Sequence, residues 1–403
     1  MASRRSGFPR GENALARAAG ARRAAGGAII DLTESNPTRV GLAYPEAALA
    51  AAMWDARSLL YAPAPAGLPA ARAAVAADLG RRGHAVDPER IVLTASTSDA
   101  YGMLFKLLCD PGDSILVPRP SYPLFDYLAT LEGVHVEHYP LLYALGWQLD
   151  LDALRAAIGP RTRAIVVVSP NNPTGSRLGE DERRALVDLA RTHDLALIAD
   201  EVFADYSFPG ARPGPDLLAA HDDVLTFSLG GLSKGAGLPQ LKLGWIVCAG
   251  PAAARAEAQA RLELIADSYL SVATPVQHAA PALLALAPAL RDAIRARTQD
   301  NRAWLAVATA GTACTLLAAD GGWSAVLRVP AVPSTSTSTS TSTSTSTSEE
   351  ALVLDLLADG VLVHPGYFFD FASEAFLVVS LLPAPGDFQA GMARVLARCA
   401  RPS

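Results

Sequence analysis

The sequence has few lysines and few cysteines, and both shortages limit the chemistry it can support. Of the 34 Lys and Arg residues among 403, only three are lysines: Lys106, Lys234 and Lys242. A reaction that needs a lysine amine therefore has three candidates. The 4 cysteines are far apart and show no C-x-x-C spacing, so neither a disulfide framework nor a zinc site is expected. A reducing, cytoplasmic location is the expectation.

Long apolar runs and an excess of positive charge are also lacking. No stretch approaches the roughly 18 apolar residues of a membrane-spanning helix. The net charge of −6 gives no support for nucleic-acid binding. The arginine-rich N-terminus is interpreted as an alanine-rich helix at 12–23, ended by Gly26 and Gly27, in preference to a transit peptide. His135 and His138 are expected on opposite faces of a strand, so no metal site is predicted.

Between residues 91 and 247, short apolar segments alternate with amphipathic ones. The apolar segments are partly β-branched and apolar on both faces, which is typical of buried parallel strands. They are Ile91–Leu93, Ser114–Val117, Ala164–Val168, Leu195–Ala199, Val224–Ser228 and Trp245–Val247. This pattern predicts an α/β sheet with helices on both sides.

The chain after residue 252 changes character. A long helical region runs to about residue 310, and short strands alternating with helices follow, which indicates a smaller α+β part. Ser334–Ser348 is a strict Ser-Thr alternation with nothing apolar to bury, so it is predicted to be a disordered insertion.

Polar or glycine-rich segments follow four of the expected strands, at the edge where α/β sheets bind ligands. The Ser-Thr-Ser at 96–98 precedes a helix at 100–108, and such a helix start is an anion site or an ordinary cap. The segment SPNNPTG at 169–175 either presents an amide at a strand tip or forms a plain turn. Asp200 ends a buried strand, which is costly for a carboxylate without a partner. Lys234 follows two glycines that let the backbone approach a ligand, and no Walker A pattern is present.

Taken together, these four segments resemble the fold-type I pyridoxal-phosphate enzymes, in particular the class I/II aminotransferases, over nearly the whole chain. The resemblance implies a pyridoxal 5′-phosphate-dependent aminotransferase that moves an amino group between an amino acid and a 2-oxo acid in a ping-pong reaction. It implies a large domain at 45–285 with a mostly parallel seven-stranded sheet. A smaller α+β domain would comprise residues 1–44 and 286–403, and two copies would form a homodimer.

The resemblance also implies roles for individual residues. Lys234 is similar to the Schiff-base lysine, and Asp200 to the carboxylate that keeps the pyridine nitrogen protonated. Asn172 matches the amide that bonds to the phenolic oxygen, and Tyr122 matches the aromatic ring that stacks on the cofactor. Tyr61 is similar to the tyrosine that reaches the phosphate of the neighbouring subunit. The other residues expected at the cofactor are Ser96, Thr97 and Ser98 at its phosphate, Lys242 beside the phosphate, and Ser233.

Three departures from the family pattern concern the cofactor. Lys242 stands where an arginine is usual, and it can neutralise phosphate only as a point charge. Phe203 stands where a tyrosine usually donates to the phenolic oxygen, so we expect the cofactor–lysine Schiff base to titrate at a higher pH than in relatives with tyrosine. The loop that begins at Tyr61 has one residue more than the usual spacing.

A fourth departure concerns the substrate. Val378 stands where an arginine usually binds the substrate α-carboxylate, and residues 329–393 contain no arginine. Arg39 and Asn36 in the N-terminal segment, and Tyr367 in the segment HPGY, are the candidate substrate-binding residues. A surface role for Arg39 is the alternative.

Two other functions keep the cofactor but change its use. One is a C–S lyase or another side-chain lyase, which the missing carboxylate arginine leaves open. The other is a non-catalytic, cofactor-binding regulator. Such regulators usually carry a DNA-binding domain first, and only about 30 residues precede Asp31, so this alternative is the weaker one.

Overall fold

The short apolar segments between residues 91 and 249 assemble into one wide sheet. The computed structural model describes residues 2–8, 11–214, 217–330, 347–373 and 375–400. Within these residues the sheet has eight strands, one more than expected, in the order β2-β9-β8-β7-β6-β3-β4-β5. Their bounds are β2 (Ile91–Thr94), β3 (Ser114–Arg119), β4 (His135–Tyr143), β5 (Trp147–Leu149), β6 (Thr162–Val168), β7 (Ala196–Asp200), β8 (Thr226–Gly231) and β9 (Gly244–Ala249).

The sheet is parallel from β8 to β4, and it has two antiparallel exceptions. β9 runs antiparallel to both its neighbours, and β5 runs antiparallel to β4. β5 is the additional strand, formed because a turn at Leu145 with φ of +65° folds the chain back along the end of β4. β8 extends past its expected end at Ser228 through Gly230 and Gly231, which pair with β9. A Cβ on Gly230 would lie 2.3 Å from Nε1 of Trp245, so the strand can continue there only with glycine.

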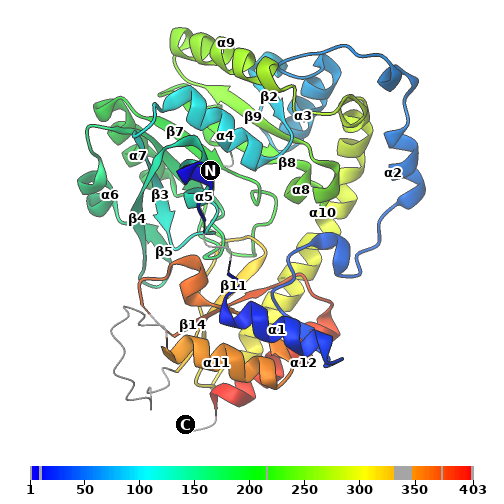
Figure 1. Ribbon diagram of the computed structural model, residues 1–403, viewed down its shortest axis with the longest axis vertical. Helices are drawn as coiled ribbons and strands as arrows, with labels where there is room; N and C mark the ends of the chain where they lie inside the picture. The colour runs from blue at the N-terminus through cyan, green and yellow to red at the C-terminus, as the bar shows by residue number, and fades with distance from the viewer. Residues whose placement is uncertain (1, 9–10, 215–216, 331–346, 374, 401–403) are drawn as a thin grey trace.

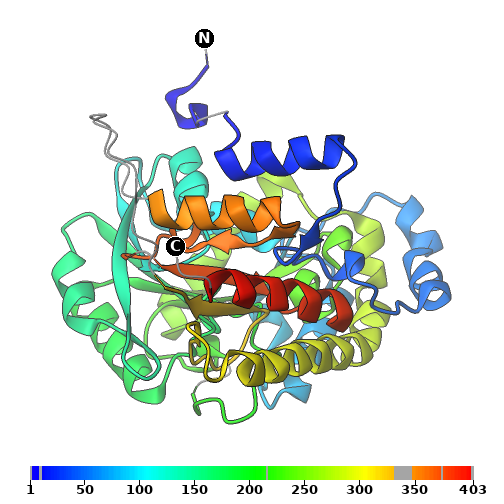
Figure 2. The same ribbon diagram turned by 90° about the horizontal axis from the view of Figure 1, so that it is seen from below.

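Helices cover both faces of this sheet (Figures 1 and 2). One face carries α4 (Thr97–Leu108), α5 (Phe125–Glu132) and α9 (Ala252–Tyr269). The opposite face carries α3 (Pro69–Arg81), α6 (Leu151–Ala157), α7 (Glu180–His193) and part of α10 (Thr274–Thr309). Alternation along the strands produces this division, because Ile115 and Val117 belong to the core shared with α4, α5 and α9, whereas Leu116 belongs to the core shared with α6 and α7. Within the described residues, no helix combines the length and the apolar composition that crossing a bilayer requires.

Two smaller sheets form the second part of the molecule. A four-stranded sheet has the order β10-β11-β14-β13, and β1 pairs in parallel with β12. Their bounds are β1 (Ile30–Asp31), β10 (Thr315–Leu316), β11 (Ser324–Arg328), β12 (Val361–Leu362), β13 (His364–Pro365) and β14 (Phe376–Ser380). Helices α1 (Ala14–Ala24), α11 (Thr347–Ala358) and α12 (Pro385–Cys399) pack around the same core. The α+β character of this part is as expected.

Helix α10 connects the two parts without a break. It passes through Pro281 and Pro288 and contacts α3 of the large part and α12 of the small one. The predicted division at residues 285 and 286 falls inside this helix and stays a prediction. Residues 334–346 of the Ser-Thr repeat lie outside the described residues. Thr347 and Ser348, expected to belong to the insertion, are instead the first residues of α11.

Candidate active site

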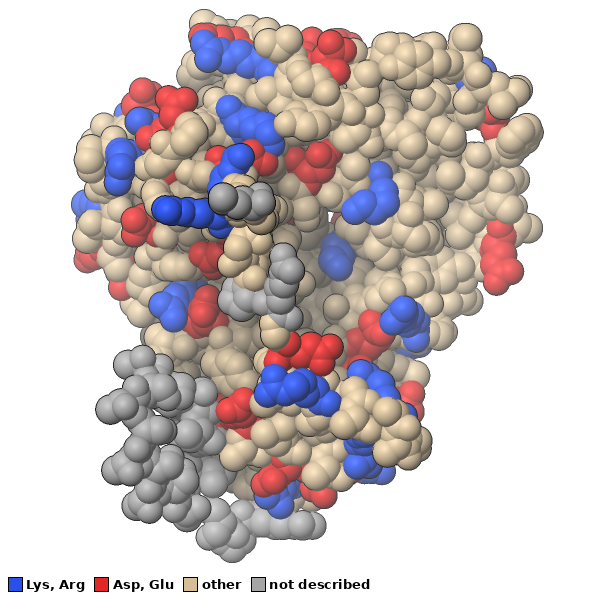
Figure 3. Space-filling model, viewed as in Figure 1, with Lys and Arg blue, Asp and Glu red and all other residues tan. Residues whose placement is uncertain are grey.

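The polar segments singled out in the sequence lie at one edge of the large sheet. β2 and β8 both run antiparallel to β9, and β7, β6 and β3 run parallel to β8. The carboxyl ends of five strands therefore share an edge, which is where ligands bind in α/β sheets. Figure 3 shows a hollow between the part with the large sheet and the part with the small sheets, with a basic side chain visible inside it.

Asp200 ends β7, and both of its carboxylate oxygens accept hydrogen bonds. Oδ1 accepts from the N–H of Val202 at 3.2 Å, and Oδ2 accepts from the hydroxyl of Tyr101 at 3.1 Å. Burial raises the pKa of Asp200 to about 6, although these two bonds and the charge of Lys234 oppose the change. A cationic nitrogen beside the carboxylate would lower that pKa again. The position therefore suits a positively charged ligand atom.

Lys234 lies directly after β8 in the four-residue helix α8 (Leu232–Gly235), one residue after Ser233. Its Nζ lies 5.0 Å from the ring centroid of Trp323 and 5.7 Å from that of Phe203. Among the described residues, Nζ has no hydrogen-bond or ion-pair partner. Burial lowers the pKa of Lys234, while the charge of Asp200 opposes the change. An amine with a lowered pKa is available as a nucleophile.

Two side chains from elsewhere hold the turn that carries Lys234. The hydroxyl of Tyr206 donates to the carbonyl of Lys234 at 2.5 Å, and Nε of Arg291 donates to the carbonyl of Gly235 at 2.5 Å. The carbonyl of Lys234 also accepts the N–H of Gly237 at 3.2 Å, so backbone and side-chain donors hold this turn together. Arg291 is held in turn by Asp78, whose two oxygens both lie 2.9 Å from Nη2 of Arg291.

The start of α4 offers backbone donors to an anion. Oγ of Ser96 caps the helix by accepting the N–H three residues later, at 3.1 Å. The N–H groups of Thr97 and Ser98 have no acceptor in the described part of the chain. The segment that follows Lys242 approaches this helix start, because a Cβ on Gly244 would lie 3.0 Å from the carbonyl carbon of Ser96. Free N–H groups at a helix N-terminus, with a lysine near them, suit a phosphate.

The loop that carries Asn172 touches the small sheet. Oγ of Ser324, at the start of β11, donates to Oδ1 of Asn172 at 3.3 Å. Nδ2 of Asn172 has no partner among the described residues, so its donors remain available. Gly175, with φ of +68°, accepts the N–H of Gly321 at 3.0 Å, and a Cβ on Gly175 would lie 2.5 Å from the carbonyl oxygen of Gly321. Both the backbone conformation and this close approach require glycine.

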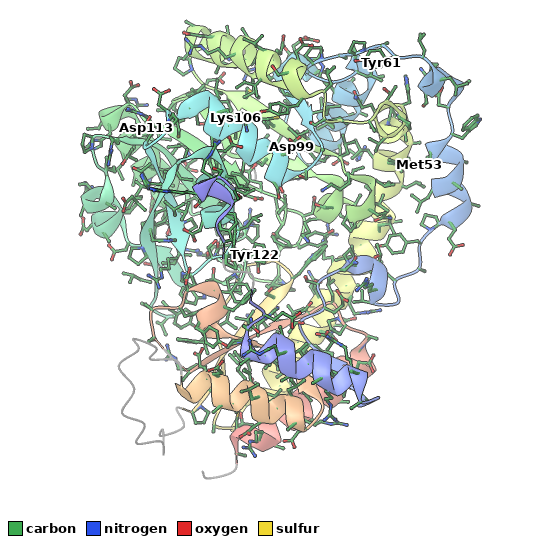
Figure 4. The ribbon with its side chains drawn as sticks, in the orientation of Figure 1. Met53, Tyr61, Asp99, Lys106, Asp113 and Tyr122 are labelled. Carbon is green, nitrogen blue, oxygen red and sulfur yellow. The ribbon has the colours of Figure 1, made fainter. Side chains whose placement is uncertain are left out.

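Tyr122 and Tyr61 occupy different parts of the molecule, as Figure 4 shows. Tyr122 is about half-exposed near the middle of the molecule, and its ring centroid lies 6.5 Å from that of Phe369. Tyr61 lies on the outer side near α9 and is 78% exposed. Tyr61 is thus separate from Tyr122 of its own chain.

These groups fit pyridoxal phosphate. The free N–H groups of Thr97 and Ser98 suit its phosphate, and the carboxylate of Asp200 suits its ring nitrogen. The unpartnered amine of Lys234 suits its aldehyde. A model of the family "Aminotransferase class I and II" matches residues 28–386 of the chain. The chain belongs to this family.

Relatives agree with this assignment, and a solved structure agrees with the fold. Glutamate-pyruvate aminotransferase AlaA of Escherichia coli K12 is 31% identical over 284 residues, which cover 69% of this chain and 70% of the relative. An alanine aminotransferase of Mycobacterium tuberculosis H37Rv is 30% identical over 316 residues, covering 77% and 70%. An alanine aminotransferase structure from Pyrococcus furiosus matches the fold with a TM-score of 0.85 at 24% identity, covering 98% of this chain and 99% of that one.

The chain is therefore a pyridoxal-phosphate-dependent aminotransferase, as predicted. The names of its relatives favour transfer of an amino group over the lyase alternative, and an enzyme over a non-catalytic regulator.

The three residues predicted to bind the aminotransferase substrate have different surroundings. The side chain of Arg39 is 74% exposed and lies 4.0 Å from a carboxylate oxygen of Glu34. Oδ1 of Asn36 caps the short 3₁₀ helix η2 (Pro37–Arg39) by accepting both the N–H and the hydroxyl of Thr38. Tyr367 lines a cavity between α1 and β13. The substrate roles of Arg39, Asn36 and Tyr367 stay predictions.

Sequence reasoning missed four residues that contact the predicted cofactor residues: Tyr101, Tyr206, Trp323 and Ser324. Only Tyr101 carried a usable signal, since it lies one helical turn after Thr97. Tyr206, three residues after Phe203, uses its hydroxyl on the carbonyl of Lys234.

Proposed function

We propose that the active site of this transaminase is built around Lys234 and Asp200 at the carboxyl edge of the large sheet. The observation that carries the proposal is an unpartnered lysine amine, in the described part of the chain, close to a largely buried carboxylate that interacts with its charge. In the ping-pong reaction, an amino acid would donate its amino group and a 2-oxo acid would receive it. When bound, pyridoxal phosphate supplies the electron sink for this chemistry.

Each residue would perform a task that its surroundings support. Lys234 would bond to the cofactor aldehyde, be displaced by the substrate amine, and then move a proton to and from the substrate α-carbon. Asp200 would hold the ring nitrogen protonated, and Asn172 would donate to the phenolic oxygen. Ser96, Thr97, Ser98 and Lys242 would bind the phosphate, with Ser233 next to them and Tyr122 stacked on the ring.

A panel of amino donors tests this function. With a productive donor alone, the visible absorbance of the cofactor should change to that of its amine form, and a 2-oxo acid should restore it. Alanine and glutamate belong in the panel because the names of relatives refer to alanine, glutamate and pyruvate. A lyase would instead return to the starting absorbance and release ammonia. Lys234→Ala should abolish turnover and the visible band, and retained turnover would reject the assignment.

We further propose that two copies of the chain assemble and that Tyr61 completes the site of the partner subunit. Its exposure and its separation from Tyr122 support this assignment. Apolar side chains are also exposed near Tyr61, which is typical of a surface covered by another chain. They are Trp54, just after α2 (Glu46–Met53), with Leu59, Leu60, Leu264 and Tyr269. Light scattering should give twice the chain mass of 42.0 kDa, and Tyr61→Phe should weaken cofactor binding.

The proposed location is the cytoplasm. The cysteines Cys109, Cys248, Cys314 and Cys399 are free thiols, which supports a reducing compartment. Fractionation of cells that express the chain tests this location.

A further inference from the structure

His364 lies on the edge strand β13, on the sheet face that meets the candidate active site. In the strand register, His364 is directly opposite Val378 of β14, which is opposite Val326 of β11. Side chains directly opposite each other in antiparallel strands project to the same face. Two residues from Val326, on that same face, Ser324 donates to Asn172. The face that carries His364 is therefore the one that reaches the predicted cofactor residues.

Aromatic contacts hold the ring of His364 and leave its nitrogens free. The ring stacks on Phe368 with centroids 4.9 Å apart and meets the ring of Phe369 edge-on at 5.6 Å. Phe369 also lies 6.5 Å from Tyr122, the ring proposed to stack on the cofactor. Neither nitrogen of His364 has a hydrogen-bond partner within the described residues. The ring lines a cavity of about 490 Å³ between α1 and β13.

Charged and titratable groups from four other elements surround this histidine. They are Glu12 and Arg23 at α1, Asp31 on β1, Tyr367 in the 3₁₀ helix η7 (Gly366–Phe369) and Glu349 on α11. Arg23 and Asp31 pair at 3.2 Å, and Glu349 accepts backbone N–H groups on both oxygens. Burial lowers the pKa of His364 to about 4, against the charge of Asp31. The imidazole is therefore neutral at neutral pH unless an anion binds beside it.

Nearby arginines are oriented toward other groups. Arg328 lies over the ring of Phe376, and Nε of Arg119 donates to the carbonyl of Asp370 at 2.8 Å. Val378, opposite His364, is buried and apolar. An amino acid and a 2-oxo acid both bring a carboxylate that needs a donor in this site, and the imidazole of His364 is a donor without a partner.

We propose that His364 binds the carboxylate of the amino-acid and oxo-acid substrates and takes up a proton from solvent as it does so. This inference rests on the proposed function, because it assigns the carboxylate site of that same reaction. Proton uptake links affinity to pH: between the pKa of His364 in the free protein and its higher pKa in the complex, affinity for the carboxylate falls about tenfold for each unit of pH. An arginine in the same role would give no such dependence, since it stays charged.

The test uses the cofactor-free protein and propionate, a carboxylate that cannot be transaminated. Nuclear magnetic resonance follows the imidazole titration of the 7 histidines. The signal of His364 is the one that is missing from the spectrum of His364→Gln. Saturating propionate should raise the pKa of His364 from about 4 to about 7 or above, and propionate should then bind at least about tenfold more weakly at pH 8 than at pH 6.

Two variants separate the donor from the ring. His364→Gln keeps an N–H donor that does not titrate, so its affinity for propionate should be weak and independent of pH. His364→Phe keeps a ring to stack on Phe368 but has no donor, so it should lose affinity about tenfold or more at pH 6. Thermal unfolding of both variants checks their folding, and the wild-type titration stands if either fails to fold.

Several results would overturn the proposal. They are an unshifted His364 titration with propionate, equal wild-type affinity at pH 6 and pH 8, or a His364→Gln variant that binds propionate like the wild type. These measurements need no turnover, so they are independent of the amino-donor panel. If no amino donor reacts but propionate shifts the titration of His364, the aminotransferase reaction is rejected and the carboxylate site is retained. If a donor reacts but propionate does not shift the titration, the carboxylate site is rejected and the reaction is retained.

Discussion

Removing Asp78 should destabilise the fold strongly, because it leaves the buried guanidinium of Arg291 without its main counter-charge. Arg291 lies beside the turn that carries Lys234. The side chains of Arg291 and Asp78 are 7% and 4% exposed, and both oxygens of Asp78 lie 2.9 Å from Nη2 of Arg291. Breaking a buried pair by deleting one partner costs about 3–5 kcal/mol. Asp205, 3.6 Å from Nε of Arg291, remains as a partial counter-charge. We therefore expect about 3 kcal/mol for Asp78→Ala.

The assay is equilibrium unfolding in guanidinium chloride, read as the free energy of unfolding in water. Asp152→Ala is the matched control, since Asp152 and Arg155 form an exposed pair at 2.9 Å, and its loss should cost about 0.5 kcal/mol or less. The double variant D78L/R291M replaces the ion pair with apolar groups and should recover most of the loss. A cost below about 1 kcal/mol for Asp78→Ala, or a double variant no more stable than the single one, would refute the reasoning.

The double variant also separates stability from function. Arg291 holds the carbonyl of Gly235, next to Lys234, at 2.5 Å. D78L/R291M should therefore fold stably yet turn over more slowly than the wild type. If its turnover equals that of the wild type, the contact between Arg291 and Gly235 does not position Lys234.

Three further predictions concern single residues. Burial raises the pKa of Glu201 from 4.5 to about 7, so the folded state loses roughly 3 kcal/mol of stability as the pH rises between those values. Glu201→Gln should therefore unfold at a higher temperature than the wild type at pH 8, with little advantage at pH 4. Gly175→Ala should lower the unfolding temperature, because of its φ of +68° and the 2.5 Å approach of its Cβ to the carbonyl oxygen of Gly321; an unchanged temperature would contradict this. Phe203→Tyr should lower the pKa of the Schiff base at Lys234, followed by visible absorbance against pH, if the new hydroxyl reaches the phenolic oxygen; an unchanged pKa would show that it does not.

The strands and loops of the large sheet were predictable because their signals are local. Ile91–Leu93 and Ala164–Val168 are short and apolar on both faces, and a strand of that kind can be stable only between two covering layers. The loops after them carry Ser96 and Asn172, and parallel strands bring their carboxyl ends to one edge wherever they pair. The family pattern could therefore be recognised from the sequence. The eighth strand was missed because β5 has only three residues and forms by folding back on β4.

The contacts between distant segments were not predictable, since no local pattern encodes them. Trp323 lies over Lys234, 89 positions away in the chain, and Ser324 bonds to Asn172 across 152 positions. The same holds for Arg291 and Asp78, which are 213 residues apart.

The amino-acid sequence by itself was enough to recognise the family and, through the family, the cofactor. With three lysines in the chain, only Lys234 follows a strand in a glycine-rich turn, and Asp200 ends the neighbouring strand. The tertiary structure decided what surrounds this chemistry, because burial and strand register depend on segments that meet only in the folded chain. Strand register placed His364 opposite Val378. From the sequence it was known only that Val378 stands where the family usually has an arginine. Burial set the pKa values of Lys234, Asp200 and His364, and no spacing in the sequence reports burial.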